Sequence, residues 1–519
     1  MKLRVGPVLA VLLAITVLTC AGGAFAQEDP SPRTDALSAE SRAGQTKPAA
    51  AVQGDPAPDS PKKAGPFDLS INWRERTEGW DWFQGPTGDS NYPLWDSLLL
   101  VTIGQKRERL DWQVDMAQVM ILGLPNDAVA PAPQGQLGLG GTYYAANGGQ
   151  SNNAGAFPQQ AFVRLKNLVP GVLQIGRFEY FDGLEVKPQD STLAALEQTR
   201  VSQRLIANFG FSAVQRSFDG AQYSLNLGKD NLTFFAARPT EGVFQVDGWG
   251  ELDVDIYSGA FTLPLKTAHS AGELRVFGMG YIDHRTLVLK TDNRPQAVRA
   301  ADHGRIEIAT YGADYLHVFN TGTAGKFDFL VWGALQGGAW GALTQRAGAF
   351  AGEAGWQPPL ERLKPWLSAG YSYGSGDSNP NDGTHGTFFQ LLPTPRLYAR
   401  FPFYNMMNNE DFYGTLNVRP ASKLSLRSEA HFLRLASAAD LWYLGGGAFQ
   451  PQTFGYTGRP SGGSRSLANV LDISGDYRIT RNFSATLYYG HAWGKSVVAS
   501  IYPNDRNGSL AFLETNWHF

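Results

Sequence analysis

The sequence has a single cysteine in 519 residues, Cys20, and it lies in the N-terminal segment. Long apolar runs are absent as well: beyond that segment there is no stretch of about 20 apolar residues, the length that a membrane-spanning helix needs. The mean hydropathy is −0.24. A fold held by internal disulfides and a polytopic helical membrane protein are therefore both excluded.

Motifs for catalysis and energy coupling are also scarce. There is no His-Glu-x-x-His pair and no P-loop, and most of the eight histidines stand singly. The sequence predicts no cofactor and no enzyme, although a Ser-His-Asp set could still assemble from separate strands. The net charge of −3 gives no support for nucleic-acid binding, which usually shows as a basic domain.

The N-terminus has the pattern of an export signal. Lys2 and Arg4 precede an apolar core, and residues 24–26, Ala-Phe-Ala, form a small-x-small cleavage site. We predict a signal peptide over residues 1–26; lipoprotein processing at Cys20 is the less favoured alternative. Residues 27–66 are rich in Pro, Ala and Ser with no apolar period, which predicts a disordered periplasmic segment.

From residue 67 to residue 519 the pattern becomes period two. Residues 69–74 and 472–479 alternate apolar with polar side chains, as strands with one apolar face do. Short Gly-, Pro- and Asn-containing turns are expected at 167–171, 228–231, 264–267, 419–423 and 480–482. Long excursions are expected at 123–158, 183–213, 376–408 and 436–466.

Short turns that alternate with long loops are typical of an outer-membrane barrel, with turns in the periplasm and loops outside the cell. The fold class predicted is therefore all-β: a transmembrane antiparallel β-barrel of about 18 strands in the outer membrane of a Gram-negative bacterium, surrounded by lipid and lipopolysaccharide. Phe519 ends an alternating strand, as expected of the signal read by the barrel-assembly machinery. A soluble array of β-sandwiches is the alternative.

Arginines recur on the polar faces of the expected strands. A lipid-facing arginine at the membrane midplane is unfavourable by about 2–4 kcal/mol, so these side chains should face the lumen or a rim. They would attract anions there, or pair with acids such as Glu429 to stiffen the wall, and spacing alone leaves both roles open. The residues are Arg74, Arg76, Arg107, Arg109, Arg164, Arg216 and Arg427.

Two stretches carry a family resemblance. Residues 172–185 read Val-Leu-Gln-Ile-Gly-Arg-Phe-Glu-Tyr-Phe-Asp-Gly-Leu-Glu, followed by Arg-Val-Ser-Gln-Arg-Leu-Ile at 200–206 and Phe-Gly-Phe-Ser-Ala-Val-Gln-Arg-Ser-Phe-Asp-Gly-Ala-Gln-Tyr at 209–223. The second stretch, residues 374–394, runs from Gly-Ser-Gly-Asp-Ser-Asn to Leu-Leu-Pro-Thr. Both resemble the alginate export family of outer-membrane porins, and the resemblance spans roughly residues 67–519.

The resemblance implies an 18-stranded monomeric barrel with an electropositive constriction. It implies that Arg177, Arg200, Arg204 and Arg216 line or brace the conduit. The acids that would hold these arginines are Glu179, Asp182, Glu185 and Asp219. Residues 183–213 would form a long loop able to fold over or into the pore.

A weaker pattern lies in the second stretch. Asp377, Asn379 and Asp382 resemble part of a calcium loop, but one residue too many precedes the glycine. Phe388 stands where the bidentate glutamate belongs. A turn-rich loop is the favoured interpretation.

These observations favour a passive, anion-selective conduit, with export of an acidic, alginate-like polysaccharide as the leading hypothesis. The main alternative is a substrate-specific uptake porin for small carboxylates or other nutrients, which would use the same field in the opposite direction. A plugged barrel for adhesion or surface structure is the third hypothesis.

Overall fold

The computed structural model describes residues 62–166, 170–402 and 405–519. Its main sheet is antiparallel apart from one two-residue addition, and 18 of its 20 strands form a closed barrel, because the last strand pairs with both its predecessor and the first. The predicted 18-stranded barrel is thereby confirmed. The signal peptide predicted at 1–26 and most of the segment 27–66 lie outside the described residues.

The barrel strands follow the chain around the ring. They are β2 (Phe67–Asp81), β3 (Asn91–Lys106), β4 (Leu110–Leu122), β5 (Asn153–Lys166), β6 (Val172–Phe178), β7 (Phe218–Leu227), β8 (Asp230–Pro239), β9 (Val254–Lys266), β10 (Ser270–Asp283), β11 (Ile306–Asn320), β12 (Lys326–Trp340), β13 (Leu343–Gln357), β14 (Trp366–Gly374), β16 (Asn409–Ala421), β17 (Leu424–Arg434), β20 (Ser466–Arg478), β21 (Phe483–Gly494) and β22 (Asn507–His518).

The remaining elements are short. They are β1 (Lys62–Ala64), β15 (Thr384–His385), the hairpin of β18 (Leu441–Gly445) and β19 (Tyr456–Pro460), the helices α3 (Leu139–Ala146), α4 (Ser191–Leu196), α5 (Gln296–Ala300) and α6 (Ser496–Ile501), the π-helix η2 (Glu197–Val201), and the 3₁₀ turns η3 (Gly322–Ala324) and η4 (Pro395–Leu397). No helix among the described residues is long and apolar enough to cross a membrane.

The strand pattern explains why the barrel has an apolar outside and a polar inside. On β20, Leu471 and Ile473 are exposed while Asp472 and Ser474 are buried. Successive side chains of a strand point to opposite faces, so each such strand places apolar groups toward lipid and polar groups toward the lumen. Closure then leaves no unpaired edge, which the hydrocarbon region would not tolerate.

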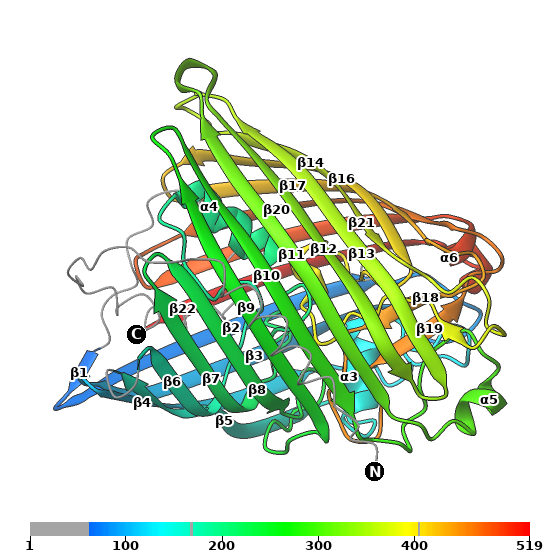
Figure 1. The fold of residues 1–519 in the computed structure, drawn as a ribbon. Coiled ribbons are helices and arrows are strands. Elements are labelled where there is room, and N and C mark those ends of the chain that lie inside the picture. The colour runs from blue at the N-terminus through cyan, green and yellow to red at the C-terminus, as the bar shows by residue number, and fades with distance from the viewer. Residues whose placement is uncertain (1–61, 167–169, 403–404) are drawn as a thin grey trace, which may run out of the picture.

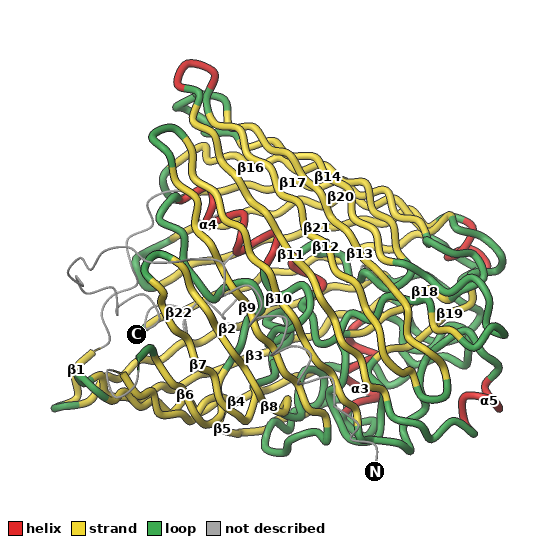
Figure 2. Tube along the Cα trace, in the orientation of Figure 1, coloured by secondary structure: helices red, strands yellow, loops and turns green. Residues whose placement is uncertain are grey.

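The two ends of the barrel differ. Helices α3, α5 and α6 and the β18–β19 hairpin gather at the loop end, whereas β1 and the C-terminus lie at the turn end (Figure 1). Coloured by secondary structure, the loops concentrate at that same loop end (Figure 2). The alternation of short turns with long loops is as predicted, with one exception: β12 and β13 are joined at the loop end by only two residues, 341–342.

Some predicted turns and loops were wrong by a few residues: β5 begins inside the excursion expected at 123–158, and β16 ends inside the turn expected at 419–423. The turn expected at 264–267 lies at 267–269, because the hydroxyl of Thr267 accepts from the N–H groups of His269 and Ser270 and so fixes the reversal there. Within the segment 27–66, the described residues Lys62–Ala64 form β1, which pairs with the start of β2. Gly65, with φ of +64°, permits the tight turn between these strands.

A buried ion cluster lies at the seam where β22 meets β2. Arg76 and Glu514 are directly opposite each other in the register, and an Arg76 nitrogen lies 2.6 Å from a Glu514 oxygen. The same guanidinium lies 3.2 Å from Glu78 and 3.8 Å from Asp96, and only 1% of the Arg76 side chain is exposed. The contact that closes the barrel therefore depends on one fully desolvated cation.

We expect Arg76→Ala to lower the free energy of unfolding by about 3–5 kcal/mol, because it leaves buried carboxylates without their cation. Urea unfolding of the barrel from lipid vesicles measures this change. Arg238→Ala is the matched control: the side chain of Arg238 is 39% exposed and pairs with rim acids, so its loss should change stability by at most about 1 kcal/mol. Equal effects of the two substitutions would contradict the seam assignment.

Candidate functional site

The long loop between β6 and β7, residues 179–217, folds into the barrel rather than away from it. Asp190 caps α4 by accepting from the N–H groups of Thr192 and Leu193, and η2 continues that helix inward. Residues 204–217 are all buried. The segment that the family resemblance assigned to a pore loop is thus packed inside the lumen.

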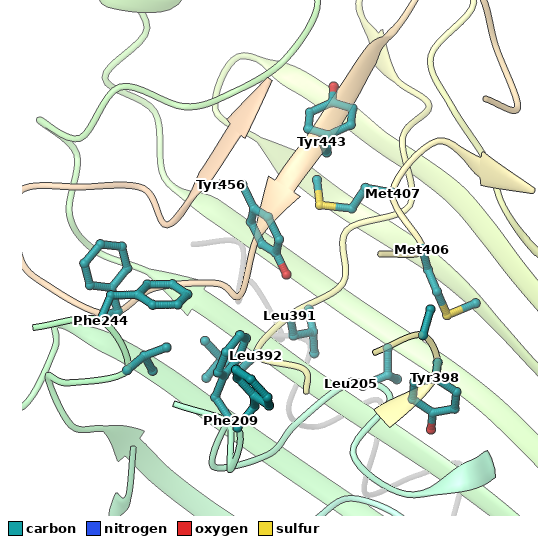
Figure 3. Close-up of a cluster of buried hydrophobic side chains, with 14 of the residues drawn as sticks. Leu205, Phe209, Phe244, Leu391, Leu392, Tyr398, Met406, Met407, Tyr443 and Tyr456 are labelled. Carbon is teal, nitrogen blue, oxygen red and sulfur yellow. The ribbon is translucent and has the colours of Figure 1, made fainter. Parts of the chain in front are cut away.

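Other loops meet this segment in the interior. The backbone N–H of Ala207 donates to the Leu392 carbonyl at 2.8 Å, and the N–H of Leu392 donates to the Leu205 carbonyl at 2.7 Å. Figure 3 shows the apolar side chains that gather around this pairing, which we call the loop core. Its labelled residues are Leu205, Phe209, Phe244, Leu391, Leu392, Tyr398, Met406, Met407, Tyr443 and Tyr456.

One group of interior arginines is neutralised by acids. Arg200 of η2 lies 3.0 Å from both Glu353 and Glu429. These two acids belong to wall strands β13 and β17. The ion pairs therefore attach the inward loop to the wall on two sides.

A second neutralised arginine extends from the wall toward the loop. Arg275 of β10 lies 2.7 Å from Asp182, 2.8 Å from Glu185 and 3.2 Å from Asp314. Asp182 and Glu185 belong to the loop, and Asp314 belongs to the neighbouring strand β11. Such arginines have the bracing role that the sequence left open, because the adjacent carboxylates neutralise their charge.

A second group forms no ion pair with a carboxylate anywhere in the described residues. Arg204 contacts the Met406 sulfur and the Arg200 carbonyl, and its guanidinium lies over the Tyr398 ring. Arg216 donates to the carbonyls of Ala448 and Gly446. These cations connect one loop to another through neutral acceptors, so no carboxylate partner neutralises their positive charge.

Arg396 completes this group, which we call the unneutralised arginines: Arg204, Arg216 and Arg396. Its three guanidinium nitrogens are buried without a hydrogen-bond partner, and the group stacks 3.3 Å from the centre of the Phe211 ring. Burial lowers the pKa of Arg216 and of Arg396 to about 10, and both remain cationic at neutral pH. None of the three forms an ion pair with a carboxylate among the described residues, although the charge of Glu78 partly offsets the lowering of the Arg396 pKa.

The other predicted pore residues take varied positions. Arg74 is buried and donates to the carbonyls of Gly210 and Ser212. Arg164 is buried and donates to the Gln174 side chain at 2.6 Å. Arg427 is buried 2.5 Å from Glu429. Arg177, partly buried, lies 2.6 Å from Asp219.

Arg107 and Arg109 lie at the rim. The sequence predicted that they share a strand face in the lumen or at a rim, and both are exposed in the turn between β3 and β4. The chain reverses there because Asp111 accepts from the backbone N–H of Arg107. These two arginines do not line the interior.

The predicted bracing acids differ in their partners. Asp219 holds Arg177, but Asp182 and Glu185 hold Arg275, a residue that the sequence analysis missed although it shares a strand face with Glu273. Glu179 accepts from the Asn208 amide at 2.8 Å and forms no ion pair within the described ranges. Loss of solvation in the barrel interior raises its pKa to about 8.

Two sequence motifs have local structural explanations. The side-chain oxygens of Asp377, Asn379 and Asp382 accept from backbone N–H groups two residues ahead, which shapes a turn-rich loop. Residues 370–374, Gly-Tyr-Ser-Tyr-Gly, match the Gly-x-Ser-x-Gly pattern of hydrolases. They lie within strand β14 and not on the strand-to-helix turn that this motif requires.

Two cavities lie beside the loop core. The turn-side cavity, about 160 Å³, lies between strands β5 to β7 and α4, and its lining includes Arg164, Gln174 and Glu179. The loop-side cavity, about 400 Å³, has aromatic walls that include Phe209 and Phe244, with Arg396 and Arg459 also in its lining. The loop-side cavity adjoins the loop core, whereas the turn-side cavity lies between the inward loop and the wall strands.

The sequence matches the model of the alginate export family, described as "Alginate export", over residues 69–497. The chain belongs to the alginate export family. It is therefore an outer-membrane β-barrel porin of the Gram-negative outer membrane, and such channels are normally not enzymes. No curated protein matches the sequence significantly.

Solved structures support the same fold for this alginate export family member. OccAB2 of Acinetobacter baumannii has a TM-score of 0.52 at 8% identity, with 87% of this chain and 98% of that chain covered. OccK9 (OpdG) of Pseudomonas aeruginosa gives 0.52 at 11% identity, with 87% and 98% covered. The outer membrane protein opdK of Pseudomonas aeruginosa gives 0.51 at 9%, with 87% and 99% covered.

The raised pKa of Glu179 predicts a pH-dependent current. Below about pH 8 the carboxyl is neutral, and at higher pH it places a negative charge on the turn-side cavity, where it repels anions. We expect anion selectivity to fall between pH 7 and pH 9, measured as the reversal potential across a planar bilayer under a salt gradient. Glu179→Gln should remove this step, and Glu361→Gln, at an exposed turn, should retain it.

Proposed function

We propose that the protein is a passive outer-membrane conduit for anionic solutes, and that its main substrate is an acidic polysaccharide that leaves the cell. The observation that carries this proposal is the set of unneutralised arginines in the loop core. A cation buried in a low-dielectric wall projects its field along the pore and raises the local concentration of anions. Membership of the alginate export family supports a polyuronate as the anion.

The chemistry of arginine suits this substrate. Its planar guanidinium donates two parallel hydrogen bonds to a carboxylate and holds its charge at every physiological pH. Arg204, Arg216 and Arg396 come from different parts of the two inward loops, so they offer several carboxylate positions. A polyuronate could move from one position to the next, down its concentration gradient or pushed by synthesis. A single protein chain would enclose the whole path, as expected of a monomer.

Uptake of small carboxylates is the second candidate, and the loop-side cavity supports it. Its volume of about 400 Å³ falls within the range of small-molecule sites, about 300–1,000 Å³. Its aromatic walls and the arginines in its lining would suit an apolar monocarboxylate better than a hydrated polymer. The two candidates share the anion field and differ in the size of the solute.

Single-channel recording in planar bilayers tests the proposal. We expect anion selectivity in the wild type and block by oligouronate that weakens about tenfold or more in Arg204→Gln, Arg216→Gln or Arg396→Gln, since a hydrogen bond to a charged group contributes about 1.5–3 kcal/mol. Arg238→Gln, at the exposed rim, is the control and should leave block unchanged.

The outcomes separate the candidates. Block by benzoate but not by oligouronate would favour uptake of small carboxylates. Cation selectivity would contradict both candidates, and absence of any current with all loops intact would favour the plugged structural barrel. Gel mobility before and after heating confirms that each variant has formed its barrel.

A further inference from the structure

Three side chains with metal-binding groups converge on the inner wall. They are Glu429 and His431 of β17 and Asp472 of β20, and one ligand atom from each lies within 4.8 Å of the others. Glu429 and Asp472 are opposite each other in the strand register. All three are at most 2% exposed, so water does not solvate their polar atoms freely.

Two of these atoms have no hydrogen-bond partner. Glu429 Oε2 and His431 Nε2 are both buried and unpartnered. Buried polar atoms without a partner are rare, and each typically destabilises a fold by about 1–3 kcal/mol. An imidazole nitrogen and a carboxylate oxygen without partners, beside a second carboxylate, are a donor set that a metal ion can use.

The surroundings hold these atoms in place. His431 Nδ1 lies 2.7 Å from Asp411 Oδ2. In the neutral tautomer that donates to this carboxylate from Nδ1, the imidazole would present its lone pair at Nε2. Glu429 Oε1 accepts from Arg200 at 3.0 Å and from Arg427 at 2.5 Å, which leaves Oε2 as the free oxygen. A carboxylate behind a ligating histidine is the usual outer shell of a metal site.

We propose that Glu429, His431 and Asp472 bind one divalent transition-metal ion, for which Zn²⁺ is the best match. One imidazole nitrogen and two carboxylate oxygens suit Zn²⁺ better than Ca²⁺ or Mg²⁺, which prefer oxygen ligands throughout. Bonds of about 2.0–2.2 Å place the ligands of a tetrahedral ion about 3.5 Å apart. The ligand atoms lie within 4.8 Å of one another, so binding would require them to approach by up to roughly 1 Å.

The bound ion would stabilise more than the wall. It would link β17 to β20 directly and to β16 through Asp411. Because Arg200 of η2 is held by Glu429, the ion would also fix the carboxylate to which the inward loop is attached. This role does not depend on which solute passes.

Metal binding to the intact barrel, purified without a histidine tag and treated with chelator, tests the proposal. We expect one equivalent of Zn²⁺ per chain by mass spectrometry after dialysis, and Co²⁺ bound at the same site to show the visible absorption of a four-coordinate ion. His431→Gln and Asp472→Asn should abolish stoichiometric binding. Asp411→Asn, which touches only the outer shell, should weaken binding about 10–100-fold.

His385→Gln is the matched control, because His385 is equally buried with an unpartnered Nε2 but its other nitrogen meets the Gln345 amide rather than an acid. It should bind Zn²⁺ as the wild type does. Absence of stoichiometric metal on the wild type, or its retention in both ligand variants, would overturn the proposal and assign the cluster to a proton-bearing ion network. If the ligand variants fail to form barrels, Zn²⁺ binding by Asp411→Asn decides: weakened binding supports the proposal, and unchanged binding overturns it.

Discussion

The structure depends on one constraint: a chain that crosses lipid as strands must pair every backbone group, and only closure achieves this. Closure fixes the alternation, since each strand then has one face toward lipid and one toward the interior. Most charges on the wall strands are thereby directed inward or to a rim, where they must be solvated or paired. The seam between β2 and β22 illustrates the result, because Arg76 there meets Glu514 within 2.6 Å in nearly complete burial.

The interior charges consequently serve two different purposes. Arg200 and Arg275 meet two or three acids each, and their fields are cancelled at short range, so they act as struts between the wall and the inward loop. Arg204, Arg216 and Arg396 meet carbonyls, sulfur or aromatic rings instead. Of the two roles that the sequence left open, the wall network is therefore formed by Arg200 and Arg275. The conduit role that we propose would fall to the arginines that have no acid partner.

The sequence was sufficient to predict the architecture of the barrel. It was insufficient to predict which acid pairs with which arginine. Alternation on segments such as 472–479 is a local signal, and it correctly predicts strands, their inward faces and the positions of most loops. Arg107 and Arg109 show the limit of this signal. The alternating pattern of the sequence continues past the end of β3, but the Asp111 side chain has already shaped a turn there. Which acid meets which arginine depends on register and on how far a loop enters the lumen: Asp182 and Arg275 are 93 positions apart. No alternating pattern pointed to Arg396, because it lies on an irregular loop and not on a strand with an inward face.

The loop core also explains how a pore can be both filled and conductive in the proposed function. Arg216 is held by the neutral carbonyls of Gly446 and Ala448, and Arg204 by a carbonyl and a sulfur. A carboxylate is a stronger acceptor for a guanidinium than a neutral carbonyl is, so an arriving anion can replace these partners with a modest gain in free energy. The displaced carbonyls re-form their bonds once the anion moves on, which limits how tightly any single position binds. Arginines held by neutral acceptors thus meet the requirement of a conduit, that each site be favourable enough to enter and weak enough to leave, whereas arginines held by acids such as Glu353 would resist exchange and keep the loop in place.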